Sequence, residues 1–318
     1  MINLVEIGKK LLAANVALRA GERVLVVTDD DKQAIGQALY QAAKELGAQA
    51  TMVLTPPAAV AGAEPYDCVA DLMKQADVVL CPTAQSMTHT NAVIHAAAGG
   101  ARVVTMPGIT EEMFLRGAMT ADYDRVERLS LNLARRLDAA KWAKLVTEEL
   151  ELHICLEGRP GVASTGVFRA PGNKGNLPSG EAYIAPMEGR SWGKVRVDGS
   201  IVGVGMLESP MEFSVKDGVL EEIRGADSGK LDILLRNPEN GTLCELGIGT
   251  NDGARLCGAI LEDEKIGGSV HVAFGTNTSF GGVTKADCHL DGVITKPDLW
   301  LDEEQIIRKG EFLISLED

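Results

Sequence analysis

Helical and strand-like patterns alternate along the first half of the chain, and this alternation constrains the fold more than any other feature. A short β-branched run at residues 23–28 has the composition of a strand buried on both faces. Segments with helical apolar spacing, at residues 4–18 and 32–46, lie on either side of it. The order predicts a parallel, doubly wound sheet with helices on both faces. Further strands are expected at residues 50–54, 77–81 and 102–106, and further helices at residues 67–75 and 91–98.

The pattern changes near residue 150. A long helical stretch is expected at residues 122–149; beyond it glycines become dense and helical periodicity largely disappears, apart from one helix expected near residues 228–237. Two β-rich runs end in Asp-Gly, at residues 198–199 and 217–218, which is typical of strands that lead into tight turns. We therefore predict an α/β domain over residues 1–150 and a mostly β domain, with a bent or barrel-like sheet, over residues 151–318.

Charge and composition exclude several classes of function. A formal net charge of −14 argues against nucleic acid and against anionic membrane surfaces as partners. The chain has no signal-peptide pattern and no apolar run near the ~20 residues of a membrane span, so we expect a cytoplasmic protein. The six cysteines lack CxxC spacing and are expected to be reduced and buried. No GxGxxG follows the first strand, so no nucleotide cofactor is expected.

Carboxylates and imidazoles gather among glycines in the last third of the chain. His289 and Asp291 form a His-x-Asp pair, and on a strand both side chains would point to one face. Glu245 lies in an apolar, strand-like run, where a buried carboxylate needs a cation, a metal or hydrogen-bond donors. His271 begins another apolar run, where a histidine is more often a core residue than a ligand. Such oxygen and nitrogen donors on a stiff backbone predict a metalloenzyme.

Three further features of the sequence bear on the site, and two of them allow two interpretations. Glu181 follows a rigid loop and is either aimed into the site or exposed at a strand edge. Residues 262–264 form an acidic run that should face solvent, with at most one ligand among them. His89 follows a predicted strand, where parallel sheets bind ligands, and is either an acid/base group or an incidental histidine in a helix-capping loop.

The second half resembles the metallo-aminopeptidase family of aminopeptidase T and aminopeptidase S. The resemblance rests on residues 176–181 (NLPSGE), 245–251 (ELGIGTN), 271–275 (HVAFG) and 289–291 (HLD). It implies a hydrolase with two divalent ions (Zn, Co or Mn) that releases N-terminal amino acids or cleaves a small amide. The ligands that it implies, with Glu245 bridging the ions, are Glu181, Glu245, Glu264, His271, His289 and Asp291. Glu181 or Glu264 would act as general base where it does not bind metal, and the metals or His89 would stabilise the oxyanion. The family's catalytic Tyr after His271 is missing from this chain.

A second resemblance covers the stretch without that tyrosine. Residues 275–282 (GTNTSFGG) and 288–291 (CHLD) are similar to the 2,5-dihydroxypyridine 5,6-dioxygenases, ring-opening enzymes with one non-haem iron held by two His and one Asp. His289 and Asp291 match two of these ligands, whereas Glu245 stands where the family has its third ligand His, and Glu181 where it has a Phe. That family also carries an active-site His in a loop similar to that of His89.

Three hypotheses follow, in different functional classes. The main prediction is a metal-dependent hydrolase acting on a short peptide or small molecule. The alternative is a mononuclear Fe(II) dioxygenase acting on a dihydroxypyridine-like aromatic, with a triad of His271, His289 and Asp291. The third is a binding protein whose carboxylates hold a structural ion. Both resembling families imply a homodimer or a larger homo-oligomer.

Overall fold

The computed structural model describes residues 3–315, which form two compact units. The first unit comprises the chain up to Tyr123 together with Gly166–Ser179, and the second comprises Asp124–Thr165 together with the chain from Gly180 onward. This division differs from the predicted boundary at residue 150, because the chain passes into the second unit early and then returns to the first. The returning segment adds a strand to the first unit's sheet.

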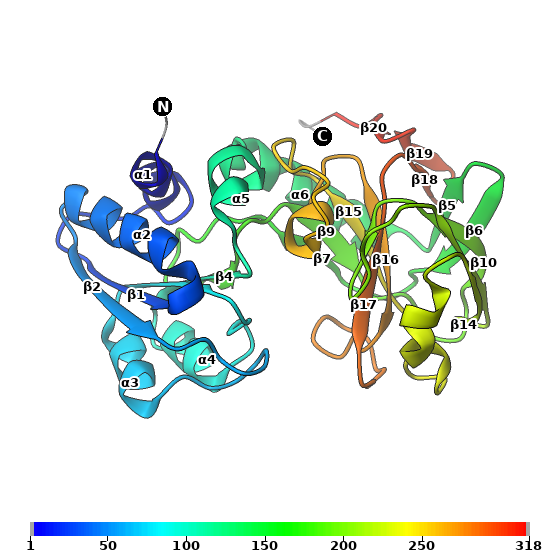
Figure 1. Cartoon of the computed structure of the whole chain (residues 1–318). Coiled ribbons are helices and arrows are strands. Elements are labelled where there is room, and N and C mark those ends of the chain that lie inside the picture. Colours follow the sequence, from blue (N-terminus) through cyan, green and yellow to red (C-terminus); the bar gives the residue numbers. More distant parts are fainter. Residues whose placement is uncertain (1–2, 316–318) are drawn as a thin grey trace. The chain divides into compact units, whose positions relative to one another are not determined.

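The first unit is an α/β unit built on a five-stranded parallel sheet of order β2-β1-β3-β4-β8. Helices α1 and α2 cover one face of the sheet, and α3 and α4 cover the other (Figure 1). The predicted parallel sheet with helices on both faces is confirmed. The strands are β1 (Arg23–Asp29), β2 (Gln49–Thr55), β3 (Val78–Thr83), β4 (Arg102–Pro107) and β8 (Lys174–Asn176). The helices are α1 (Leu4–Ala14), η1 (Asp30–Lys32), α2 (Gln33–Glu45), α3 (Asp67–Gln75), α4 (Asn91–Ala98), α5 (Glu111–Arg116) and η2 (Ala118–Thr120).

The second unit is mostly β, as predicted, and contains two sheets. The eight-stranded sheet has the order β14-β13-β10-β6-β5-β18-β19-β20, and the seven-stranded sheet has the order β12-β11-β17-β16-β15-β9-β7. The first sheet consists of β5 (Trp142–Thr147), β6 (Leu150–Cys155), β10 (Trp192–Val197), β13 (Met211–Lys216), β14 (Val219–Arg224), β18 (Asp298–Leu301), β19 (Glu304–Arg308) and β20 (Glu311–Phe312). The second consists of β7 (Gly161–Ser164), β9 (Glu181–Ile184), β11 (Ser200–Ile201), β12 (Gly205–Met206), β15 (Leu243–Gly249), β16 (Val270–Gly275) and β17 (His289–Ile294).

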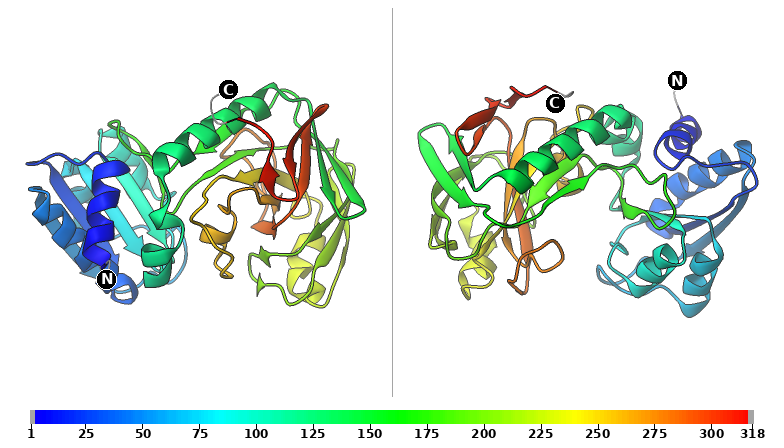
Figure 2. Two further views of the ribbon diagram at one scale, coloured as in Figure 1. Left: turned by 90° about the horizontal axis from the view of Figure 1, so that it is seen from above. Right: turned by 180° about the vertical axis from the view of Figure 1, so that it is seen from behind.

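The core of the second unit lies between its two sheets. Alternate residues of β15 and β16, such as Leu246 and Phe274, meet apolar residues of the other sheet. Phe274 stacks on Phe213 of β13 with ring centroids 5.7 Å apart. Helix α6 (Tyr123–Ala139) lies beside the strands and adds leucines to this core (Figure 2). Because the inner face of the seven-stranded sheet is filled in this way, its other face is available for polar side chains.

Two elements of the second unit differ from their predicted form. The helix expected over residues 122–149 ends at Ala139, and Trp142–Thr147 forms strand β5 instead. This strand pairs with β6 on one side and β18 on the other, and every second residue of it is buried. Pairing with these distant strands outweighs the local helical pattern. The helix expected near residues 228–237 is the 3₁₀ helix η3 (Ser228–Leu235). The Asp217-Gly218 turn is confirmed: both residues have positive φ and join β13 to β14 in a hairpin.

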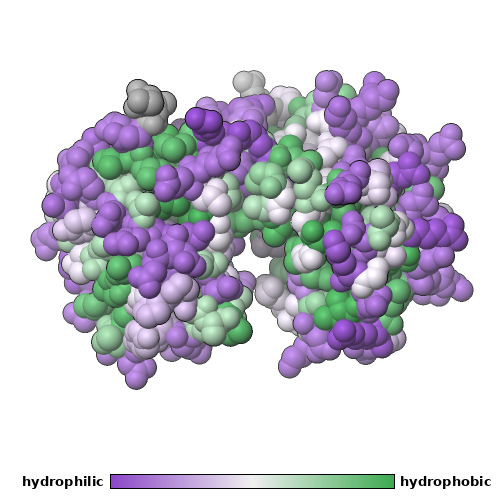
Figure 3. Space-filling model, viewed as in Figure 1, coloured by the Kyte–Doolittle hydropathy of each residue, from purple (hydrophilic) through white to green (hydrophobic). Residues whose placement is uncertain are grey.

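The space-filling view in Figure 3 shows mainly polar side chains. Hydrophilic side chains cover much of the face shown in Figure 3, with smaller apolar areas between them. No helix within residues 3–315 is long and apolar enough to cross a membrane. All six cysteines are free, as expected, but Cys68 and Cys257 are exposed, so the prediction that every cysteine is buried is wrong.

Candidate metal centre

One face of the seven-stranded sheet carries most of the predicted site. In antiparallel strands, directly opposed residues share a face. Gly247 of β15 is opposed to both Tyr183 of β9 and His271 of β16, and His271 is followed two residues later by Ala273, which is opposed to Asp291 of β17. This register brings five of the six predicted ligands to one face, namely Glu181, Glu245, His271, His289 and Asp291.

Small residues between these side chains leave room on the same face. Gly247, Gly249 and Gly275 lie on it, together with Ala273. At Gly247 the space is already taken by His271: a Cβ added there would lie 2.0 Å from Nε2 of the imidazole. The ring of His271 therefore lies directly over a glycine backbone, which only glycine permits at this distance.

Glu245 occupies the centre of the cluster. Its Oε1 lies 3.3 Å from Nε2 of His271, and its Oε2 lies 3.2 Å from Nε2 of His289. The residue is only 7% exposed, in agreement with its predicted burial. Burial alone would raise the pKa of this carboxyl, but the hydrogen bonds with His271 and His289 outweigh it and lower the pKa to about 2. Glu245 is therefore a carboxylate that both imidazoles share.

His289 is held in the orientation that a metal ligand requires. Its Nδ1 lies 2.8 Å from the carbonyl oxygen of Thr276. A carbonyl oxygen only accepts hydrogen bonds, so Nδ1 carries the proton and donates it. In the neutral ring, Nε2 is then free to bind an ion, and it points toward Glu245 and toward Asp291, whose Oδ1 is 3.4 Å away. A backbone carbonyl that fixes the second ring nitrogen is a common partner of metal-binding histidines.

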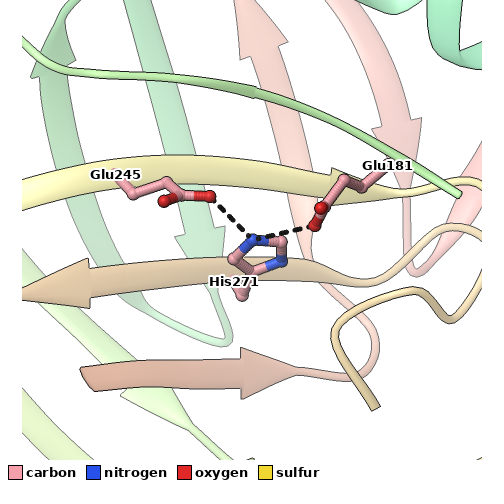
Figure 4. A group of neighbouring side chains, drawn as sticks. All are labelled: Glu181, Glu245 and His271. Carbon is pink, nitrogen blue, oxygen red and sulfur yellow. Dashed lines mark hydrogen bonds and ion pairs between the residues drawn. The ribbon is translucent and has the colours of Figure 1, made fainter. Parts of the chain in front are cut away.

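His271 lies between two carboxylates (Figure 4). Its Nε2 is 3.6 Å from Oε2 of Glu181 and 3.3 Å from Oε1 of Glu245. Burial lowers the pKa of this imidazole, but the hydrogen bond with Glu245 and the charge of Glu181 outweigh it and raise the pKa to about 9. Within residues 3–315, its buried Nδ1 has no hydrogen-bond partner. The polar surroundings contradict the interpretation of His271 as an ordinary core residue.

Glu264 reaches the cluster from outside the sheet. It follows the short helix α7 (Ile260–Asp263), and donor atoms of Glu264, His271 and Asp291 all lie within 4.8 Å of one another. Burial raises the pKa of Glu264 to about 7, against the lowering effect of the neighbouring Lys265 charge. Glu264 is therefore the one residue of its acidic run that faces the cluster.

Lys265 is a member of the cluster that the sequence interpretation missed. Its Nζ lies 2.6 Å from Oε1 of Glu181 and also forms an ion pair with Glu264. The residue is 3% exposed. Lysine is rarely buried unless it is paired, so nothing in the composition pointed to it. Its position directly after Glu264 is the one signal in the sequence.

The prediction that the rest of this acidic run faces solvent is wrong. Glu262 and Asp263 are 1% and 0% exposed. Asp263 accepts hydrogen bonds from the Ser200 hydroxyl at 2.6 Å and from the Cys257 amide at 2.7 Å. Glu262 accepts one from the Arg255 amide at 3.1 Å. Both carboxylates hold backbone around helix α7 and so help to fix the segment that carries Glu264.

An aromatic pair lies beside the cluster. Phe280 packs edge-on against Tyr183 of β9, with centroids 5.3 Å apart, and against His289, with centroids 6.1 Å apart. Burial raises the pKa of Tyr183 above its usual range. Tyrosine is thus present near the site, but it comes from β9 rather than from the segment after His271.

The loop that carries Phe280 is anchored by a half-buried acid. Glu188 accepts hydrogen bonds from the Asn277 side chain at 3.0 Å and from the Val283 amide at 2.9 Å, and it pairs with Arg159. Arg159 also donates to the Gly281 carbonyl. The loop after β16 is therefore fixed by contacts that lie apart from the candidate ligands.

His89 belongs to the first unit, whereas all six candidate ligands belong to the second. It lies in the loop between β3 and α4, where its side chain is exposed. The neighbouring Thr88 hydroxyl is hydrogen-bonded to Thr105 and Asn176 of the same unit. A role for His89 in catalysis stays a prediction.

The donor set fits a divalent metal. Three overlapping groups of donor atoms share residues: Glu181, Glu245 and His271; Glu245, His289 and Asp291; Glu264, His271 and Asp291. Four carboxylates face one ammonium, so the cluster is net negative whenever both imidazoles are neutral. Uncompensated buried charge is costly, and carboxylate oxygen with imidazole nitrogen is the donor combination of iron, manganese and zinc sites.

Comparisons with known proteins agree with this fold and this class of site. The family model described as 2,5-dihydroxypyridine 5,6-dioxygenase matches residues 4–314. The solved 2,5-dihydroxypyridine dioxygenase of Pseudomonas putida KT2440 is 19% identical, with a TM-score of 0.82 over 98% of this chain and 97% of that chain. Wild-type AmpT (aminopeptidase T) of Thermus thermophilus is 16% identical, with a TM-score of 0.71 over 98% of this chain and 99% of that chain. No curated protein matches the chain in sequence.

Proposed function

The chain belongs to the 2,5-dihydroxypyridine 5,6-dioxygenase family, and we propose that it is a mononuclear non-haem Fe(II) dioxygenase that opens the ring of a dihydroxypyridine-like aromatic. The observation that carries the proposal is the family match, which spans every residue of the candidate centre. Of the two enzyme functions predicted from the sequence, this match favours ring cleavage over the main prediction of hydrolysis.

The proposed iron ligands are Glu245, His289 and Asp291, whose donor atoms all lie within 4.8 Å of one another. The triad of His271, His289 and Asp291 that the sequence suggested is not supported, because no group of donors within that distance among the described residues contains both imidazoles. Many Fe(II) oxygenases hold the metal with two histidines and one carboxylate; here Glu245 takes the place of one histidine, and His271 lies 3.3 Å from it. When bound, the iron of such a three-ligand site offers open positions for dioxygen and for substrate oxygens. The Thr276 carbonyl keeps the proton of His289 on Nδ1 and thereby keeps Nε2 available.

The substrate side of the proposed centre is aromatic. Tyr183 and Phe280 meet edge to face beside His289. Aromatic rings favour offset-stacked and edge-to-face contacts with one another, so this pair suits a flat heteroaromatic ring. Glu188 fixes the Phe280 loop through contacts that do not involve the proposed ligands. In this proposal Tyr183 and Phe280 orient the substrate, and the sheet orients the ligands.

Oxygen consumption tests the proposal. The protein is stripped of metal, loaded anaerobically with Fe(II), and mixed with 2,5-dihydroxypyridine in an oxygen electrode. We expect one O₂ consumed per substrate, with loss of the aromatic absorbance and no reaction by the metal-free protein. An Fe(II)-loaded, folded protein that consumes no oxygen with any dihydroxypyridine would rule the function out.

A second candidate function is a metal-dependent aminopeptidase-like hydrolase. The observation that favours it is the carboxylate-rich set, because Glu181, Glu245 and Glu264 join the two histidines and Asp291. Here two Zn, Co or Mn ions would activate a water, and Glu181 would serve as ligand or base. Release of an N-terminal amino acid from short peptides without oxygen, by Co²⁺- or Zn²⁺-loaded protein, would establish it in place of the dioxygenase.

A further inference from the structure

An ammonium group is built into one end of the carboxylate cluster. Lys265 directs Nζ to Oε1 of Glu181 at 2.6 Å and also pairs with Glu264. Its side chain is 4% exposed. Lys265 therefore does not form an exposed surface ion pair. Its charge is enclosed by carboxylates that also line the candidate metal centre.

The backbone is shaped to bring Lys265 to this position. Gly249 of β15 is opposed to Glu181, and a Cβ at Gly249 would lie 2.1 Å from the carbonyl oxygen of Ile266 and 2.7 Å from the carbonyl carbon of Lys265. The Asn251 amide donates to the Lys265 carbonyl at 2.8 Å. The segment after α7 therefore packs directly on the glycine beside Glu181, which fixes the start of the lysine side chain as well as its end.

The two carboxylates that Lys265 binds are ligands in the six-residue set that a second metal ion would need. Oε1 of Glu181 is used by the ammonium, and its Oε2 faces His271 at 3.6 Å. Glu264 likewise gives Oε1 to the ammonium. A divalent ion at this end would lose these oxygens and would meet a like charge at short range. At the other end, Glu245, His289 and Asp291 have no lysine or arginine partner within the described residues.

We propose that Lys265 takes the place of a second metal ion, so that the cluster binds a single divalent ion at the end formed by Glu245, His289 and Asp291. The inference deepens the proposed function, because it rests on that function's metal centre. It assigns Lys265 a positioning role: the ammonium neutralises Glu181 and Glu264 and keeps them out of the coordination of the ion. It also explains how a chain with a carboxylate-rich, hydrolase-like ligand set would work with one metal.

Metal stoichiometry tests the inference independently of activity. Three full-length proteins are compared: the wild type, Lys265→Met and Lys265→Arg. Each is saturated with Mn²⁺ and separated from excess metal by gel filtration. The Mn²⁺ content, measured by elemental mass spectrometry, is divided by the protein concentration to give the number of ions per chain. The methionine removes the charge at nearly the same length, and the arginine retains it. Electron paramagnetic resonance of bound Mn²⁺ separates an isolated ion, with its six-line spectrum, from a spin-coupled pair.

We expect one Mn²⁺ per chain for the wild type and for Lys265→Arg, and two per chain, with a coupled spectrum, for Lys265→Met. Two ions in the wild type would overturn the inference, even if the methionine variant does not fold. A folded Lys265→Met protein that still binds one ion would overturn it as well. If the wild type binds one Mn²⁺ but its Fe(II)-loaded form consumes no oxygen, the proposed dioxygenase is defeated and the role of Lys265 stands. A wild type that binds no ion at all would defeat both.

Discussion

The two ends of the carboxylate cluster differ in the cation that each one can hold. At one end, Glu181 and Glu264 close on the ammonium of Lys265. At the other, Glu245 and Asp291 face His289, whose Nδ1 is bound to a backbone carbonyl and whose Nε2 is directed at both carboxylates. We therefore propose that the first end holds the ammonium in place of a metal and that the second end binds the ion.

This difference shows why ligand types alone do not give a metal count. The residues that resemble a two-ion aminopeptidase set are all present on or beside one sheet face. A lysine outside that set changes which of them are free to bind an ion. The following predictions test the two ends separately.

The largest effect is expected from His289→Ala at the metal end. Changes in residues that merely orient a ligand lower metal affinity by about 10–100-fold, so loss of the ligand itself should cost more than about 100-fold. Competition with a chelator measures the change. His153→Ala is the matched control, because His153 belongs to β6 of the other sheet and stacks on Trp192 with ring centroids 4.1 Å apart. Equal metal affinity in both variants would show that His289 is not a metal ligand.

Glu245→Gln removes the charge between the two imidazoles and nearly preserves the shape. Glutamine keeps a neutral carbonyl oxygen that can still bind the ion weakly, so we expect a smaller fall in metal affinity than for His289→Ala, of about 10–100-fold. Lys265 should still bind Glu181 and Glu264 in this variant, so the fold should persist. Titration calorimetry with Mn²⁺ gives the affinity, and unchanged binding would show that Glu245 serves the fold alone.

Gly247→Ala tests the space under His271. The added Cβ would lie 2.0 Å from Nε2, so the ring must move. We expect a loss of about 1–3 kcal/mol in the free energy of unfolding, together with weaker metal binding. Gly229→Ala is the control, because a Cβ at Gly229 meets nothing within 4 Å. A denaturant titration that gives both variants the same free energy of unfolding would contradict this geometry.

Glu188→Gln should have the smallest effect, since Glu188 anchors the Phe280 loop and touches no candidate ligand. Its pKa is lowered: burial alone would raise it, but hydrogen bonds from the Val283 amide and the Asn277 side chain, with the charge of Arg159, outweigh burial. A lowered folded-state pKa gives stability that is present above the ordinary glutamate pKa of about 4.3 and is lost as the pH falls through the folded value.

At neutral pH we therefore expect Glu188→Gln to be less stable than the wild type by about 1 kcal/mol, with the difference shrinking as the pH falls below about 4.3. Metal content should not change, and KM for the aromatic substrate should rise while kcat changes little. Urea titrations at several pH values give the first result. A difference that grows in acid would show that the Glu188 contacts do not stabilise the loop.

Much of the fold could be predicted because its signals are local. The parallel sheet follows from β-branched runs between helical patterns, and β1 and α2 lie within a few residues of their predicted bounds. Strand β5 could not be predicted in this way, because Trp142–Thr147 becomes a strand through pairing with β6 and β18. The domain division depends on the same long-range contacts, which leave no local pattern.

The residues of the candidate site also differ in whether the local sequence could predict them. His289 and Asp291 could be paired from their spacing, and the buried position of Glu245 followed from its apolar neighbours. The places of Glu181 and Glu264 rested on a family resemblance. Lys265 could not be found, because a lysine at the end of an acidic run looks solvent-exposed until the backbone is folded against Gly249.

The single-ion centre is tested most directly by anomalous diffraction from crystals of the metal-loaded protein, measured at the absorption edge of Fe or Mn. We expect one peak per chain, next to Glu245, His289 and Asp291, with Lys265 in contact with Glu181 and Glu264. Two peaks per chain, one of them between Glu181 and Glu264 with Lys265 displaced, would contradict the single-ion centre.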